Sequence, residues 1–186
     1  LIHHSYSWQI GTHFAHRMWE YGLWAFGAFT IGVGVFPVVV ALAWGLSGLQ
    51  RTRDERVLLG LLIGTVVAFG LYTGVKASYQ STNFAIRINE RNLIYLAPIV
   101  FAVMARWLAE GRARYWATGV AAAAVGYVVW TTPYHMEEHL AVDAPGLAIL
   151  SWFNRTWYWT PTDARRLLVT MLAISVVVLV VRELLA

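Results

Sequence analysis

The chain has 186 residues, of which 59% are hydrophobic and only 13% charged, and its mean hydropathy is +0.56. This composition is too apolar for an ordinary soluble domain and predicts a membrane protein. Cysteine is absent, which excludes disulfides and thiolate metal sites. The net charge is +4, but the basic residues are spread over short segments between apolar runs. This pattern argues against a nucleic-acid-binding face and favours anionic lipid or a phosphorylated substrate as the partner.

Apolar runs long enough to cross a bilayer predict an all-α fold, a polytopic membrane helical bundle of about five transmembrane helices. We expect these spans at residues 21–46, 57–75, 92–109, 115–132 and 164–181. The first span contains Pro37, where we expect a kink. The fourth contains a run of alanines, which permits close contact with another helix.

The segments outside the spans differ in length and character. Residues 1–20 are polar and aromatic, which predicts a short interfacial helix with Trp8 and Trp19 at headgroup depth. Short charged turns follow the first and third spans, whereas 76–91 and 133–163 form longer polar loops. We expect residues 1–186 to form a single membrane domain. Because the chain begins with Leu1 and has no signal pattern, we also expect it to be a piece of a longer protein.

The distribution of lysine and arginine normally sets the orientation of a membrane protein. Here the 14 basic residues divide evenly between the two sides that the expected spans define, so their number does not decide. The tight turns lie on one side, while the histidines, the long loops and most tryptophans lie on the other. We therefore place the tight turns in the cytoplasm and the loops 76–91 and 133–163 outside.

A basic cluster precedes the third span. Arg87, Arg91 and Tyr95 recur every four residues, so they share one face if the helix begins early, with Glu90 beside them. Guanidinium groups form bidentate bonds with phosphate oxygens, and Lys76 adds a further positive charge. The cluster is interpreted as a lipid-phosphate site in the outer headgroup region. The alternative is a salt-bridged helix start whose arginines snorkel to the interface.

The run from Glu90 to Phe101 reads E-R-N-L-I-Y-L-A-P-I-V-F. It resembles the segment E-R-Y-L-x-x-x-x-P of the GT-C superfamily of membrane glycosyltransferases, and most closely that of the protein-mannosyltransferase-like bacterial branch (glycosyltransferase family 39-like). Glu90, Arg91 and Pro98 match the pattern. Asn92 stands where that family usually has tyrosine, and Tyr95 follows one turn later.

The resemblance implies a multi-pass protein of the bacterial cytoplasmic membrane that serves the cell envelope. Such enzymes move a hexosyl or pentosyl group from a polyprenyl-phosphate donor to an acceptor on the outer face, with a carboxylate as general base. In the family that carboxylate lies in the first extracytoplasmic loop, which this chain lacks. We therefore expect the catalytic acid outside this C-terminal portion. The substrate-binding residues expected here are Arg87, Glu90, Arg91, Tyr95 and Lys76.

Two groups of histidines raise the question of a metal. His135, Glu138 and His139 spell the H-x-x-E-H order of some zinc proteases, which favours a zinc-dependent membrane hydrolase as a third interpretation. Zinc would need a further ligand such as Asp143, and the surrounding motif is missing. The histidines near the start, including His13 and His16, are more typical of an interface without metal. We predict no metal site and no cofactor.

Trp152, Trp157, Tyr158 and Trp159 are clustered before the last span. Such a group anchors a loop at the membrane interface, or alternatively stacks on sugar rings. The main alternative to the transferase is a non-enzymatic membrane subunit, packed against partners through the alanine and glycine faces of the first and fourth spans.

Overall fold

The computed structural model describes residues 12–48, 52–83, 88–110, 113–134 and 144–185. All regular secondary structure in these ranges is helical, which confirms the predicted fold class. The elements are α2 (Thr12–Val33), α3 (Val35–Leu46), α4 (Arg53–Asn83), the 3-10 helix η2 (Glu90–Leu96), α5 (Ala97–Glu110), α6 (Tyr115–Thr131), α7 (Pro145–Trp157) and α8 (Pro161–Leu185).

Within the described ranges, three helical segments are long and apolar enough to cross a membrane: Arg53–Ser81, Glu90–Ala109 and Pro161–Leu185. They contain the expected spans 57–75, 92–109 and 164–181. Helix α6 covers the expected span 115–132, but it has only 17 residues, which is about 26 Å at 1.5 Å per residue and short of a hydrocarbon core of about 30 Å. The expected span 21–46 is broken. The five expected spans are therefore not confirmed: the described residues hold three, or four with the bent pair α2 and α3.

The first span bends by 116° between α2 and α3. The break is at Gly34, whose φ of 100° and ψ of 143° lie in a region that favours glycine. We expected a kink at Pro37. Instead Pro37 lies in the first turn of α3, where a backbone N–H has no helical partner to lose, so proline is tolerated there.

The third span does not begin as an α-helix, because residues Glu90–Leu96 form the 3-10 helix η2. Pro98 has no N–H with which to bond the Ile94 carbonyl, and the N–H of Ala97 donates to that carbonyl instead. With three residues per turn, Glu90, Leu93 and Leu96 share the buried face. Arg91 and Tyr95, four residues apart, are therefore not aligned on one face as we expected from α-helical spacing.

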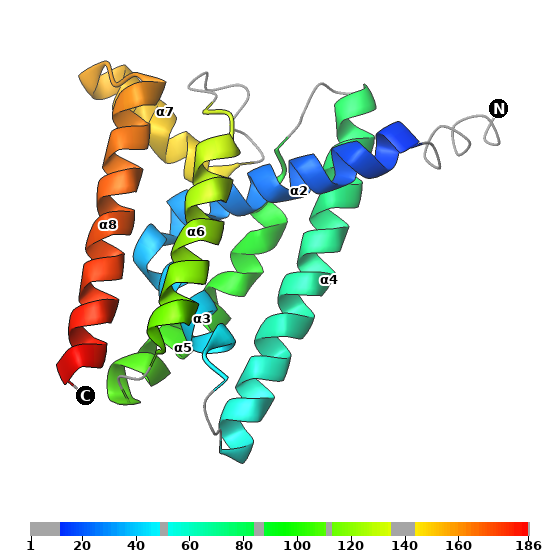
Figure 1. Ribbon diagram of the computed structural model, residues 1–186. Coiled ribbons are helices and arrows are strands. Elements are labelled where there is room, and N and C mark those ends of the chain that lie inside the picture. The colour runs from blue at the N-terminus through cyan, green and yellow to red at the C-terminus, as the bar shows by residue number, and fades with distance from the viewer. Residues whose placement is uncertain (1–11, 49–51, 84–87, 111–112, 135–143, 186) are drawn as a thin grey trace.

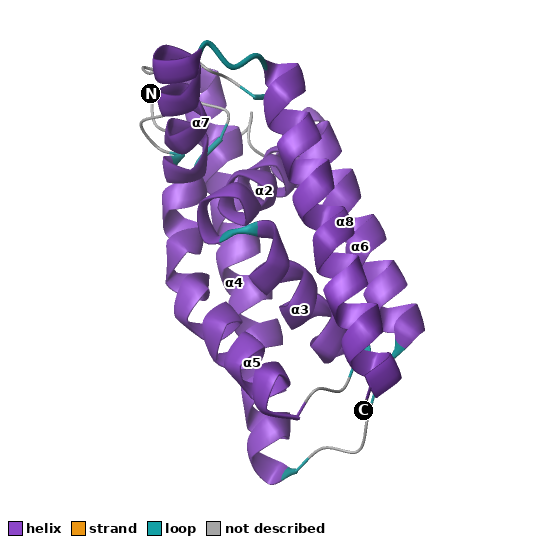
Figure 2. Cartoon of the chain, turned by 90° about the vertical axis from the view of Figure 1, so that its left-hand side faces the viewer, coloured by secondary structure: helices purple, strands orange, loops and turns teal. Residues whose placement is uncertain are grey.

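Helices α4, α5, α6 and α8 lie along the long axis of the bundle, and α2 crosses it near one end (Figure 1). Figure 2 views α2 nearly end-on, with α3 below it in the middle of the bundle. The core forms around α3, because Val35, Val39, Val40 and Ala43 are fully buried. The crossing of α2 thus closes the bundle above α3.

The two ends of the bundle carry different elements, and the expected loops 76–91 and 133–163 are partly helical, because α4 continues to Asn83 and α7 lies within 133–163. At one end α3 meets α4, α5 meets α6, and α8 ends, while α7 and the start of η2 lie at the other end (Figure 1). The tight turns and the long connections are therefore at opposite ends. Which end faces the cytoplasm stays a prediction.

Candidate functional site

Glu90, the first residue of η2, has a fully buried side chain where η2, α2 and α7 meet. Its Oε2 accepts a 2.7 Å hydrogen bond from the N–H of Gly146, near the start of α7. The first N–H groups of a helix have no intrahelical partners and carry partial positive charge, so a carboxylate stabilises them. Glu90 therefore holds the start of α7 against η2.

Two glycines make room for this contact. A Cβ atom on Gly146 would lie 2.0 Å from the Ala28 carbonyl oxygen and 2.8 Å from the Gly32 nitrogen. A Cβ on Gly32 would lie 2.9 Å from Glu90 Oε1. Helices α2 and α7 thus cross with their backbones in contact. The carboxylate of Glu90, which we expected among the substrate-binding groups, is enclosed by this crossing, so its position fits a positioning residue.

An amide network continues the junction toward α4. The Asn89 side chain is fully buried and donates to Oε1 of Gln80 at the end of α4. The Asn92 amide donates to Asn89 Oδ1 at 2.8 Å. Asn92 is the residue that stands in place of the family's tyrosine, and here its side chain stabilises the turn that opens η2. These bonds fix η2 relative to α4 as well as to α7.

The exposed side of η2 meets a face of α4. Tyr95 is 67% exposed, and its ring centroid lies 5.9 Å from that of Phe69. Lys76 is two turns further along α4 on the same face as Phe69, and its Nζ lies 5.9 Å from the centroid of the Tyr72 ring. Arg91 is exposed four residues before Tyr95 on η2. We call Phe69, Tyr72, Lys76, Arg91 and Tyr95 the α4–η2 seam. Arg87 lies outside the described residues.

At the opposite end of the bundle, polar groups pair with one another. Thr52 and Glu55 form a reciprocal capping box at the start of α4, with 2.8 Å from the Thr52 N–H to Glu55 Oε2. Glu55 also forms a 3.2 Å ion pair with Arg106 of α5. Ser47 Oγ and Glu183 Oε2 accept hydrogen bonds from the N–H groups of Arg114 and Ala113, just before α6. These pairs are structural.

The aromatic cluster at the end of α7 is compact. The Phe153 ring stacks on Trp159 at a centroid distance of 4.8 Å and lies 5.0 Å from Trp157, which is 5.3 Å from Trp152. Tyr158, in a left-handed conformation with φ of 56°, turns the chain from α7 to α8, and its side chain is exposed. Exposed tryptophans arranged in this way suit an interfacial anchor.

The metal interpretations find no support in the described part of the chain. His135, Glu138, His139 and Asp143 lie outside it, as do His3 and His4. His16 pairs with Glu20 at 4.0 Å on the exposed side of α2. Among the described residues, no group of three histidine, aspartate or glutamate side chains could hold a metal ion.

The sequence interpretation missed the surroundings of Arg165. Its guanidinium carbon lies 5.5 Å from the ring centroid of Trp130 and 5.4 Å from that of Tyr134. Burial raises the pKa of Tyr134 to about 12, an effect that the positive charge of Arg165 opposes. Arginine near the start of a span and tryptophan near the end of another are ordinary interfacial residues, so only the fold could bring them together.

These features define an all-helical protein with helices of membrane-spanning length, several polar pairs at one end, and exposed arginine and aromatic side chains at the other. Exposed apolar residues such as Val57, Ile63, Val67 and Leu71 along α4 are consistent with a helix that faces lipid. Comparisons with protein-family models, with curated proteins and with solved structures returned no match.

Proposed function

We propose that this chain is the membrane part of a glycosyltransferase that uses a polyprenyl-phosphate sugar donor, and that the α4–η2 seam binds the donor's phosphate. The supporting observation is that Tyr95 lies against Phe69 on the face of α4 that carries Lys76, while Arg91 is exposed four residues earlier on η2. A guanidinium group binds phosphate oxygens through charge-assisted hydrogen bonds, and a phenol donates a further one. The motif E-R-N-L-I-Y-L-A-P provides the link to the GT-C superfamily.

In the proposed reaction, the acceptor's hydroxyl oxygen attacks the anomeric carbon. The bond from that carbon to the phosphate oxygen breaks, and the leaving polyprenyl phosphate takes the electron pair. A general base outside this chain takes the hydroxyl proton. Arg91 and Lys76 stabilise the negative charge that develops on the leaving phosphate. Glu90 acts indirectly, because it holds η2 in place through Gly146.

The test is sugar transfer from a polyprenyl-phosphate donor by the full-length protein in bacterial membranes. Loss of a hydrogen bond between charged groups lowers binding by roughly 1.5–3 kcal/mol, so Arg91→Ala should reduce kcat/KM about 10- to 100-fold. Arg91→Lys should recover part of the activity. Arg56→Ala is the matched control, because Arg56 is an exposed arginine near the other end of α4. Normal turnover by Arg91→Ala would refute the role assigned to the seam.

A non-enzymatic membrane subunit is the second candidate, and one face of α6 favours it. A Cβ atom on Gly119 would meet nothing within 4 Å, and Ala123, one turn later, is exposed. Small residues four apart on an open face suit a contact with another helix. The glycines of α2 are not available for this, since Gly22, Gly27 and Gly32 pack against Gly74, Thr132 and Gly146. This candidate predicts that Gly119→Leu removes a copurifying partner and that the protein transfers no sugar.

A further inference from the structure

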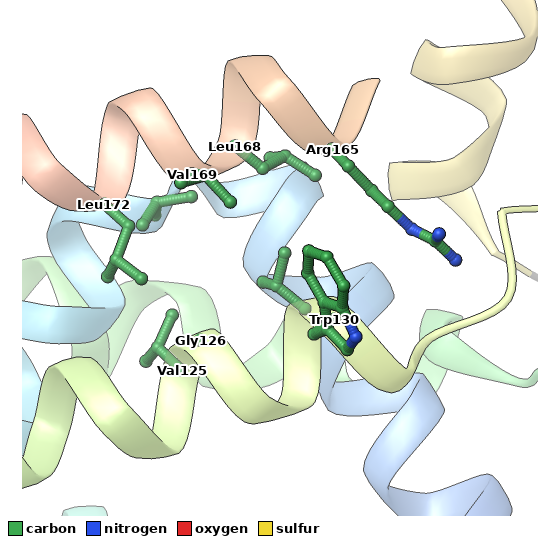
Figure 3. Close-up of a pocket in the computed structure, with 9 residues that line it drawn as sticks. Val125, Gly126, Trp130, Arg165, Leu168, Val169 and Leu172 are labelled. Carbon is green, nitrogen blue, oxygen red and sulfur yellow. The ribbon is translucent and has the colours of Figure 1, made fainter. Parts of the chain in front are cut away.

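A crevice with about 280 Å³ of empty space, part of it open to the surroundings, runs between α6 and α8. Figure 3 shows its walls, which include Val125 on α6 and Leu168 and Leu172 on α8. Val35, the residue after the break at Gly34, also lines it. The crevice is therefore apolar over most of its length.

Arg165 and Trp130 stand together at one end of this crevice (Figure 3). The guanidinium lies within 5.5 Å of the Trp130 ring centroid and within 5.4 Å of that of Tyr134. Tyr134 is itself fixed, since its hydroxyl donates to the Val129 carbonyl. Two aromatic rings hold the cation in a set direction without accepting the in-plane hydrogen bonds that a guanidinium donates.

No carboxylate of the described residues pairs with Arg165, and its Nε is buried without a hydrogen-bond partner there. The nearest acid along α8 is Asp163, whose Oδ2 accepts hydrogen bonds from the Thr160 N–H at 2.9 Å and the Thr160 hydroxyl at 2.6 Å. Arg166, next in sequence, is exposed and is not among the residues that line the crevice, so the charge here is that of Arg165. This end of the crevice therefore carries positive charge that suits an anion.

The crevice is open because residue 126 is glycine. A Cβ atom on Gly126 would already lie 3.2 Å from Leu172 Cδ2, so a larger side chain would fill the space. Arg165 and Leu172 are seven residues apart on α8, which gives a length of about 10 Å along the helix. An apolar slot of this length with a guanidinium at its end matches part of an acyl chain joined to an anionic headgroup.

We propose that this crevice binds one anionic phospholipid from the bilayer, with the phosphate on Arg165 and an acyl chain between α6 and α8. The guanidinium provides bidentate donors to phosphate oxygens, and the walls of valine and leucine side chains bury methylene groups. A zwitterionic headgroup also needs a partner for its cation, and the one described acid nearby, Asp163, is bonded to Thr160. The site is separate from the α4–η2 seam and independent of any sugar transfer.

The experiment is native mass spectrometry of the detergent-solubilised full chain with equimolar phosphatidylglycerol and phosphatidylcholine. We expect one retained phosphatidylglycerol, in clear preference to phosphatidylcholine. Arg165→Gln should lower its occupancy about tenfold, as expected when a charge-assisted hydrogen bond is lost. Arg165→Lys should retain part of the preference. Arg166→Gln, which removes the same charge one residue away, should leave occupancy unchanged.

Gly126→Leu tests the slot without touching the charge. It should reduce retention of both phospholipids, whereas Gly64→Leu on α4, where a Cβ meets nothing within 4 Å, should not. Equal retention by Arg165→Gln and Arg166→Gln would overturn the proposal. If Arg165→Gln does not fold, unchanged retention by Gly126→Leu would overturn it alone.

Discussion

The crossing of α2 and α7 makes the sharpest prediction about stability. Gly146→Ala adds one methyl group where the Ala28 carbonyl oxygen is 2.0 Å and the Gly32 nitrogen 2.8 Å from the new atom. Both obstacles are backbone atoms and cannot rotate away, so the two helices must separate. Separation also lengthens the 2.7 Å bond from the Gly146 N–H to Glu90.

The expected loss of stability has two parts. Overpacking of this kind costs about 1–3 kcal/mol. Weakening a hydrogen bond to a buried carboxylate costs about 1.5–3 kcal/mol. Replacing glycine by alanine in a helix returns up to about 1 kcal/mol, so the net loss should be roughly 2–5 kcal/mol. That is a large share of the 5–15 kcal/mol by which folded proteins are typically stable.

Thermal unfolding in detergent, followed by circular dichroism, measures the effect. For a chain of this size about 1 kcal/mol corresponds to a shift of roughly 2–4 °C, so Tm should fall by at least about 4 °C. Gly119→Ala is the matched control, because its Cβ meets nothing within 4 Å and Tm should stay the same or rise. A Tm for Gly146→Ala equal to that of Gly119→Ala would refute the close crossing of α2 and α7.

Three further predictions concern other parts of the bundle. Glu55→Ala removes both the capping box with Thr52 and the 3.2 Å ion pair with Arg106, so the free energy of unfolding should fall by about 2–4 kcal/mol. Arg53→Ala is the control and should change the free energy of unfolding little. Ser47→Ala removes an acceptor for the Arg114 N–H at the start of α6, and should cost about 1 kcal/mol and speed hydrogen exchange of that turn only. Because burial raises the pKa of Tyr134 to about 12, its neutral hydroxyl stabilises the fold at pH values below the ordinary tyrosine pKa of about 10. This contribution is lost as the pH rises from about 10 to about 12. The free energy of unfolding of Tyr134→Phe should therefore fall less over that alkaline range than that of the unchanged protein, as measured by chemical denaturation at fixed pH values.

The sequence predicted those parts of the fold that depend on composition alone. The apolar runs at 57–75 and 164–181 lie within α4 and α8, because a long apolar segment with few charges forms a helix wherever it packs. The break at Gly34 was not predicted. Pro37 was the stronger local signal, yet proline in a first turn is harmless, and the need for a positive φ comes from the way α2 must cross the bundle.

The contacts of the candidate site could be predicted only in part. The four-residue repeat of Arg91 and Tyr95 assumed an α-helix, although Pro98 already indicated that the carbonyl of Ile94 would need another donor. The partner of Glu90 is Gly146, 56 residues away, and no local pattern connects them. Thr52 and Glu55 have the spacing of a capping box, which was readable from the sequence but was interpreted only as a charged turn.

The charged side chains at the two ends of the bundle have different partners. At the end with tight turns, Glu55, Arg106 and Glu183 bond to each other or to backbone groups, whereas Arg56 is exposed and Arg182 lies 4.8 Å from the Trp107 ring centroid. At the other end, Arg165 lies near the Trp130 and Tyr134 rings, and no carboxylate of the described residues pairs with it. An aromatic ring orients a cation without neutralising it, so an approaching phosphate meets an unpaired charge. Glu90, the buried carboxylate of that end, is directed into the helix crossing and does not oppose an anion at the surface. Anionic lipid headgroups should therefore bind at this end whether or not the chain takes part in sugar transfer.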